Sequence, residues 1–225
     1  MSSPRRVRVW DLPTRIFHWA LVLLAGFSYA TGKVGGAWMD WHLKSGYAIL
    51  TLLLFRLAWG FAGSTTSRFA HFVRGPRAGV AYAREVLATR RAPAYGHNPL
   101  GGWMVVVMLA AFALQAVSGL FSDDEIATQG PLAVKVSNAT VERMSAFHSY
   151  NEWLLVGLVA LHLVAIATYT TALRTPLVGS MLHGWKAWDA GVPAPDYRTA
   201  PAWRALGLLA ICAAAVYALV VIYPR

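Results

Sequence analysis

The chain has 225 residues, of which 57% are hydrophobic and 13% charged, and its mean hydropathy is +0.46. A water-soluble domain of this length is more polar, so the composition excludes an ordinary soluble fold. The net charge of +10 does not indicate a nucleic-acid partner, because the arginines cluster between apolar blocks and no block carries a basic face of its own.

Long apolar blocks predict five membrane-spanning helices, each close to the ~20 residues that a bilayer helix needs. The predicted spans are residues 15–32, 42–63, 101–122, 148–172 and 203–223. A membrane β-barrel would instead show alternating segments of about ten residues. We therefore expect an all-α fold in which residues 1–225 form a single integral membrane helical bundle, with a four-helix core and a fifth, C-terminal transmembrane helix.

Two of the connections between the spans are long enough to hold structure of their own. Within residues 64–100, the stretch AGVAYAREVLATRR predicts a short amphipathic helix at the membrane interface, and the proline-containing segment 92–99 breaks it before the third span. Residues 173–202 are rich in Pro and Gly and contain Trp185 and Trp188, a composition that predicts a segment along the inner membrane surface.

The charges between the spans predict how the helices cross the membrane. The N-terminal segment, residues 64–100 and residues 173–202 are rich in arginine and lysine. The loop after the third span is acidic, with Asp123, Asp124 and Glu125. Because positively charged loops stay on the cytoplasmic side, we expect a cytoplasmic N-terminus and, after five spans, an outward-facing C-terminus. The acidic loop would lie outside, where it could dock a positively charged partner or be a plain solvated loop.

Four histidines occupy positions that suggest two pairs within the membrane. His148 and His162 are fourteen residues apart on the fourth span, which is close to four helical turns, roughly 21 Å of rise, on nearly the same face. Ionisable side chains inside a membrane are costly, so each needs a partner or a ligand. The predicted orientation places His42 at the outer level of His148, and His18, in the first span, at the inner level of His162.

Two imidazoles at each level fit the axial ligation of haem iron between facing helices. The chain has no C-x-x-C-H motif, so the pattern predicts two noncovalent haem b groups, with His42 and His148 outside and His18 and His162 inside. Iron atoms about 21 Å apart leave haem edges on the order of 10 Å apart, a workable tunnelling distance. A hydrogen bond between helices explains any one of these histidines, but explains four in depth-matched pairs less well.

Three further positions on these faces could serve the same centres. Arg56 follows His42 by fourteen residues and could bind a haem propionate, although snorkelling to inner headgroups explains it equally. Gly46, one turn after His42, would let a flat macrocycle approach the helix, or would serve helix packing. Glu152, one turn after His148, could orient an imidazole or relay a proton, or could be solvated.

Several stretches carry a likeness to a known family, and together they cover roughly residues 8–190. They are VWDLPTRIFHW at 9–19, WHLKSGYAILTLLLFRLAWGFAG at 41–63, SRFAHFVRGP at 67–76, HNPLGGWMVVVMLAAFALQAVSGLFSDD at 97–124, FHSYNEWLLVGLVALHLVAI at 147–166 and LVGSMLHGWK at 177–186. With these histidines at this spacing, the chain resembles the bacterial di-haem cytochrome b561 family, which includes the b-type subunits of nickel–iron hydrogenases. The likeness is closer to stand-alone cytochromes b that work beside c-type cytochromes.

The resemblance implies electron transfer across the bacterial inner membrane, with His18, His42, His148 and His162 as haem ligands. The expected partners are the quinone pool, as ubiquinone or menaquinone, and a periplasmic redox protein such as a c-type cytochrome. Membrane lipid would surround the helices, and a homo-oligomer is left open. The inner side near His18, Arg56 and the basic loop is the expected place of a quinone site. No motif encodes the direction of electron flow.

Other functions stay open at this point. The resemblance also allows a superoxide:quinone oxidoreductase, or a membrane anchor and electron-transfer subunit of a hydrogenase-like complex. The residues alone allow a metal-ion transporter that uses the four histidines with Glu152, or a structural anchor for a periplasmic enzyme. Fast reduction of the haems by superoxide would favour the oxidoreductase, and a colourless, zinc-binding protein would favour the transporter.

Overall fold

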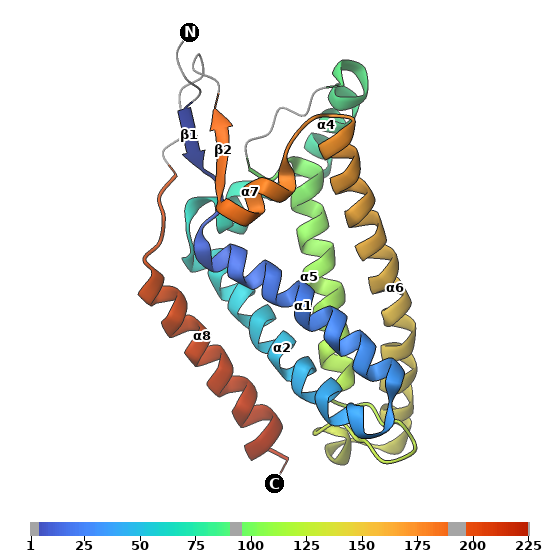
Figure 1. Ribbon diagram of the computed structural model, residues 1–225. Coiled ribbons are helices and arrows are strands. Elements are labelled where there is room, and N and C mark those ends of the chain that lie inside the picture. The colour runs from blue at the N-terminus through green and yellow to red at the C-terminus, as the bar shows by residue number, and fades with distance from the viewer. Residues whose placement is uncertain (1–4, 91–95, 189–196, 225) are drawn as a thin grey trace. The chain divides into compact units, whose positions relative to one another are not determined.

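The structure is a computed structural model that describes residues 5–90, 96–188 and 197–224, and helices dominate it (Figure 1). The long helices are α1 Leu12–Val34, α2 Met39–Ala62, α5 Pro99–Gly119, α6 Asn138–Thr171 and α8 Ala202–Tyr217, the last continued by a π-helical turn at Ala218–Ile222. The short elements are β1 Arg5–Arg8, α3 Phe69–Phe72, α4 Pro76–Thr89, α7 Leu177–His183, β2 Trp185–Trp188 and 3-10 turns at Gly36–Trp38, Thr65–Ser67 and Ala133–Lys135.

Four helices are long and apolar enough to cross a membrane, namely Gly36–Ala62, Pro99–Gly119, Asn138–Thr171 and Ala202–Ile222. They cover the second to fifth predicted spans, and the chain is a multi-pass membrane protein. The first predicted span is also helical, because α1 runs over 23 residues, or about 35 Å. Since His18 and Lys33 lower its hydropathy, α1 is less apolar than the other four, and its passage through the membrane stays a proposal.

α6 begins at Asn138, ten residues before the predicted fourth span. Its 34 residues rise about 51 Å, well beyond the ~30 Å thickness of the hydrocarbon layer. The first turns are polar, so hydropathy gives no sign of them. Ser137 caps the N-terminus of α6, because its Oγ accepts the N–H of Thr140 at 3.3 Å. His148 therefore lies well inside a helix rather than in its first turn.

The described residues divide into two compact units, and α1, α2, α5, α6 and α8 contribute residues to both. The first unit holds the described parts of residues 1–16, 58–107 and 159–205. The second holds those of residues 17–57, 108–158 and 206–225. His18, His42 and His148 belong to the second unit, and His162 belongs to the first. The surroundings of the predicted outer histidine pair are therefore found within one unit.

The first unit contains a two-stranded antiparallel sheet that the all-helical prediction missed. β1 pairs with β2, so that Arg8 lies opposite Trp185 and Val7 opposite Lys186. Four residues are too few to show a strand period, and the two strands come from opposite ends of the sequence. The Arg8 guanidinium lies 5.9 Å from the centre of the Trp185 ring. Within the predicted surface segment 173–202, residues 189–196 lie outside the described residues.

Asp11 fixes the start of α1 within the first unit. Its Oδ1 accepts the N–H of Thr14 at 2.9 Å as a helix cap, and its Oδ2 accepts Trp59 Nε1 and the Ser67 hydroxyl, each at 3.0 Å. Burial raises the pKa of this carboxyl, but hydrogen bonds from Ser64, Thr14 and Ser67 outweigh burial and leave the pKa below its ordinary value. The charged carboxylate is thus held by donors from three segments of the unit.

The predicted amphipathic helix of the basic loop is present as α4. It starts at Pro76, a residue favoured in the first turn of a helix, and it buries Gly79 and Tyr82. It ends where Arg90 adopts a left-handed conformation with φ 52°. The first half of the predicted break that follows, residues 92–95, lies outside the described residues.

In the second unit, α8 packs on α2 and on the loop that follows α5. The shared core is a cluster of Leu50, Leu120, Leu132 and Val216. The loop folds back on itself, because the N–H of Leu132 donates to the carbonyl of Leu120 at 2.8 Å. Gly130 permits this fold, since a Cβ there would lie 2.4 Å from the Gly119 carbonyl oxygen. The C-terminal helix is therefore an integral part of the unit that carries His42 and His148.

Candidate functional site

The rings of His42 and His148 lie in contact within the second unit. His42 lies in the first turn of α2 and His148 on α6, and their ring centroids are 6.1 Å apart with an angle of 84° between the planes. Two metal–imidazole bonds of about 2.0 Å, made from opposite sides of one metal, put the ring centroids about 6 Å apart. The spacing of the two rings therefore fits a bis-histidine haem iron between them.

The hydrogen bonds at Nδ1 decide which nitrogen of each ring can bind a metal. His42 Nδ1 donates to the carbonyl of Ser28 on α1 at 2.8 Å, and His148 Nδ1 donates to the carbonyl of Gln115 on α5 at 3.0 Å. Because a carbonyl only accepts, Nδ1 carries a proton in both rings, and in a neutral ring Nε2 then keeps a lone pair. This is the neutral tautomer that ligates a metal through Nε2.

A glycine stands four residues after each accepting carbonyl. A Cβ at Gly32 would lie 2.8 Å from His42 Nδ1, and a Cβ at Gly119 would lie 2.9 Å from His148 Cε1. Both distances are shorter than van der Waals contact, so any larger residue would push the ring off its carbonyl. The sequence argument missed these two glycines. The shared spacing, Ser28 to Gly32 and Gln115 to Gly119, is a signal for them only once the histidine that approaches each carbonyl is known.

A buried amide joins α5 and α6 beside His148. Asn151, only 4% exposed, donates through Nδ2 to the carbonyl of Ala111 at 3.0 Å and to Gln115 Oε1 at 2.7 Å. Gln115 thereby holds Asn151 with its side chain and His148 with its carbonyl. The orientation of the His148 ring thus depends on a polar network that closes the contact between two helices.

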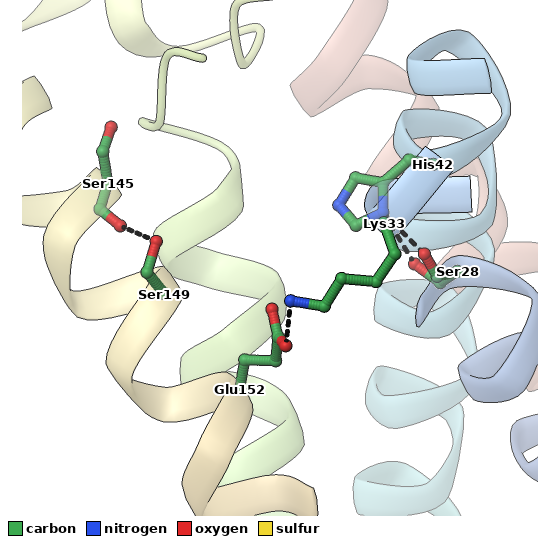
Figure 2. A network of polar contacts seen from close by, with 6 residues as sticks. All are labelled: Ser28, Lys33, His42, Ser145, Ser149 and Glu152. Carbon is green, nitrogen blue, oxygen red and sulfur yellow. Dashed lines mark hydrogen bonds and ion pairs between the residues drawn. The ribbon is translucent and has the colours of Figure 1, made fainter. Parts of the chain in front are cut away.

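Glu152 has a partner that the sequence argument did not consider. It lies one turn after His148, but His148 Nδ1 is bound by Gln115 and Ser118. Instead, Glu152 Oε1 lies 2.5 Å from Lys33 Nζ at the end of α1 (Figure 2). The carboxylate therefore forms an ion pair across helices and does not orient the imidazole.

The other predicted site residues are placed as follows. Arg56 is buried, with 2% of its surface exposed, in the second unit. A Cβ at Gly46 would meet nothing within 4 Å, so there is room beside α2 one turn after His42. His18 packs edge-to-face on Trp19, with ring centroids 5.0 Å apart. Because His18 and His162 belong to different units, their pairing stays a proposal.

Two carboxylates of the acidic loop accept hydrogen bonds from within the loop itself. Asp124 Oδ1 accepts the backbone N–H groups of Ile126, Ala127 and Thr128 at 2.8–3.0 Å. Desolvation raises the pKa of Asp124, but these donors outweigh it and lower the pKa to about 2. Asp123 accepts Gln129 Nε2 at 2.8 Å. Among the described residues, no group of three or more His, Cys, Asp or Glu side chains gathers as a metal cluster.

Comparison with known proteins places the chain in a family. The model of the family described as prokaryotic cytochrome b561 matches residues 9–184. The chain is similar to a probable Ni/Fe-hydrogenase B-type cytochrome subunit of Azotobacter chroococcum mcd 1, with 25% identity over 220 residues that cover 83% of this chain and 91% of that protein. No solved structure matches the chain. Since this match covers well over half of the chain, and includes His18, His42, His148 and His162, the chain belongs to the prokaryotic cytochrome b561 family.

Proposed function

We propose that the chain is a di-haem b-type cytochrome that transfers electrons across the bacterial inner membrane. It would connect the quinone pool with a periplasmic redox partner such as a c-type cytochrome. Membership of the cytochrome b561 family supports haem b and membrane electron transfer. The observation that carries the proposal is the His42–His148 pair, with centroids 6.1 Å apart and both Nδ1 protons given to carbonyls.

The four histidines would hold the two haems. His42 and His148 would be the axial ligands at the outer level, and His18 and His162 those at the inner level. When bound, each haem supplies a one-electron Fe(III)/Fe(II) couple. α6 contains both His148 and His162, and fourteen residues of helix correspond to a rise of about 21 Å between the two proposed levels.

Other residues would shape the haem surroundings and the route to quinone. Buried Arg56 has a guanidinium that would pair with a propionate of the inner haem. The space beside Gly46 would let the outer macrocycle approach α2. The quinone, ubiquinone or menaquinone, would bind on the inner side, near His18, Arg56 and the basic loop. This arrangement requires α1 as a fifth span, a cytoplasmic N-terminus and a periplasmic C-terminus.

A second candidate is the electron-transfer subunit of a hydrogenase-like complex, which the similarity to the Azotobacter protein favours. In that case the outer partner is a hydrogenase and not a c-type cytochrome. The two candidates differ in which donor reduces the purified protein. A hydrogenase under hydrogen gas would reduce the haems rapidly in one case, whereas the haems would exchange electrons rapidly with a c-type cytochrome in the other.

The first test is haem content. We expect a dithionite-reduced minus oxidised spectrum and a pyridine haemochrome assay to show two haems b per chain in detergent-purified protein. His42→Ala and His148→Ala should lose the same haem, and His18→Ala and His162→Ala the other. His71→Ala, in the basic loop where the ring stacks on Tyr197, is the control and should keep both. A colourless protein, or a haem content indifferent to these changes, would refute the proposal.

A further inference from the structure

Lys33 and Glu152 form an ion pair that also contacts two aromatic rings. Lys33 Nζ lies 2.5 Å from Glu152 Oε1, and also 5.4 Å from the ring centre of Tyr29 and 5.7 Å from that of Trp153. The lysine, half exposed, is therefore held by one carboxylate and two aromatic rings. Because the two charges face each other, the loss of either partner leaves the other as an uncompensated charge beside the histidines.

Lys33 and Glu152 both lie close in sequence to the histidine site. Lys33 follows Gly32, which lies against the His42 ring, and the preceding turn provides the Ser28 carbonyl that His42 Nδ1 binds. Figure 2 shows the ion pair beside these bonds. Glu152 follows His148 by one turn, about 6 Å of rise along α6. A positive and a negative charge therefore flank one pair of facing imidazoles.

We propose that Lys33 and Glu152 act with opposite signs on the reduction potential of the redox centre held by His42 and His148, and that in the native chain their effects balance. A reduced centre carries one more negative charge than an oxidised one. A nearby cation stabilises the reduced form, and a nearby carboxylate stabilises the oxidised form. The intact pair largely cancels its own field, so the loss of one partner, but not of both, would shift the potential. Lys33 and Glu152 act through space and do not ligate the centre.

The inference rests on the proposed haem at His42 and His148, and it predicts effects of opposite sign. A merely structural ion pair would give the same defect, lower stability or haem loss, whichever partner is removed. An electrostatic pair gives a lower potential without Lys33, a higher potential without Glu152, and a restored potential when both are removed. The sign of the shift therefore separates the two roles.

The experiment is a potentiometric titration of the haem absorption band in the detergent-purified full chain, at one pH for all variants. We expect Glu152→Gln to raise the reduction equilibrium constant of the His42–His148 haem at least threefold, which is about 28 mV at 59 mV per tenfold for one electron. Lys33→Met should lower it by at least as much, and Lys33→Arg should keep it. The double variant Lys33→Met/Glu152→Gln should lie between the two single variants.

The control is Lys44→Met, which removes another exposed cation near His42 that stacks on Trp41 at 4.8 Å. It should shift the potential less than Lys33→Met does. Shifts of the same sign in both single variants, no shift in either, or an equal shift in Lys44→Met would overturn the inference. Haem content, measured on each sample, keeps a folding defect apart from a potential shift. A wild type without a haem that depends on His42 would refute the proposed function itself, and this inference with it.

Discussion

On one side of the site, His42 donates to the Ser28 carbonyl of α1 and its ring lies against Gly32; on the other, His148 donates to the Gln115 carbonyl of α5 and its ring lies against Gly119. The two half-sites share the same spacing of four residues between carbonyl and glycine. In a helix, this glycine exposes the carbonyl one turn earlier to a side chain from outside. The same local solution thus occurs on two unrelated helices.

The half-sites differ in what holds their helices together. α1 and α2 are joined by a connection of only four residues, in which Gly35 and Gly36 have positive φ angles of 68° and 55°. α5 and α6 are joined by the long loop 120–137, which constrains their contact less directly. There, the buried Asn151 supplies the contact by binding Ala111 and Gln115. A short connection and a buried amide therefore serve the same purpose.

The largest effect should come from filling the shared glycine positions. Gly32→Ala and Gly119→Ala each place a Cβ under 3.0 Å from an imidazole, so each ring must leave its carbonyl. Overpacking of this kind costs about 1–3 kcal/mol, or roughly 5- to 150-fold weaker haem binding. We expect each variant to lose the His42–His148 haem selectively, as measured by pyridine haemochrome content and by the rate of haem transfer to apomyoglobin.

The matched control is Gly26→Ala on α1, where a Cβ meets nothing within 4 Å. Its haem content should equal that of the wild type, and its helix should gain slightly in stability because alanine is the better helix former. If Gly32→Ala and Gly119→Ala keep both haems with unchanged transfer rates, the glycines have no role in seating the histidines. If only one of them loses haem, the two half-sites are not equivalent.

A smaller effect should separate the two half-sites. Asn151→Leu keeps the volume but removes the donor to Ala111 and Gln115. The Ala111 carbonyl keeps its helical N–H donor, but leaving Gln115 Oε1 without its donor costs about 1–3 kcal/mol. We expect the variant to release haem at a lower temperature than the wild type does. The haem absorbance, recorded during heating, measures this release. Ser149→Ala, two residues earlier, removes only a bond to Ser145 within the same helix and should behave as the wild type. Equal melting of the two variants would show that the long loop suffices to join α5 to α6.

Hydropathy was enough to predict the second to fifth spans, because about twenty mostly apolar residues in a row are typical of a membrane-spanning helix. The predicted depth of each histidine in the membrane also led to the expectation that His42 and His148 lie close together. Hydropathy and depth could not find the first ten residues of α6, which are polar, or the β1–β2 sheet, whose strands are short and far apart in sequence. Nor could they assign Glu152 to Lys33, because this choice depends on how α1 and α6 face each other.

The accepting groups for Nδ1 were out of reach for a related reason. Backbone carbonyls are present at every residue, so no residue type marks Ser28 or Gln115 as an acceptor. Only the glycine that follows four residues later sets these carbonyls apart, and glycine is common in membrane helices for other reasons. The spacing becomes informative once the histidine that approaches it is known.

The smallest effect should come from the hydroxyls beside the same carbonyls. Ser28 Oγ lies 3.3 Å from His42 Nδ1, and Ser118 Oγ lies 3.1 Å from His148 Nδ1. The single hydroxyl proton of Ser118 already goes to the Gln115 carbonyl at 3.0 Å, so this oxygen is a second acceptor beside the carbonyl. In Ser28→Ala and Ser118→Ala the carbonyl still fixes the tautomer, and the loss should stay below about 1 kcal/mol. We expect two haems per chain and less than a threefold change in the reduction equilibrium constant. If either serine variant instead lost haem as Gly32→Ala is expected to do, the hydroxyl and not the carbonyl would be the acceptor that orients the ring, and the shared spacing of carbonyl and glycine would lose its physical meaning.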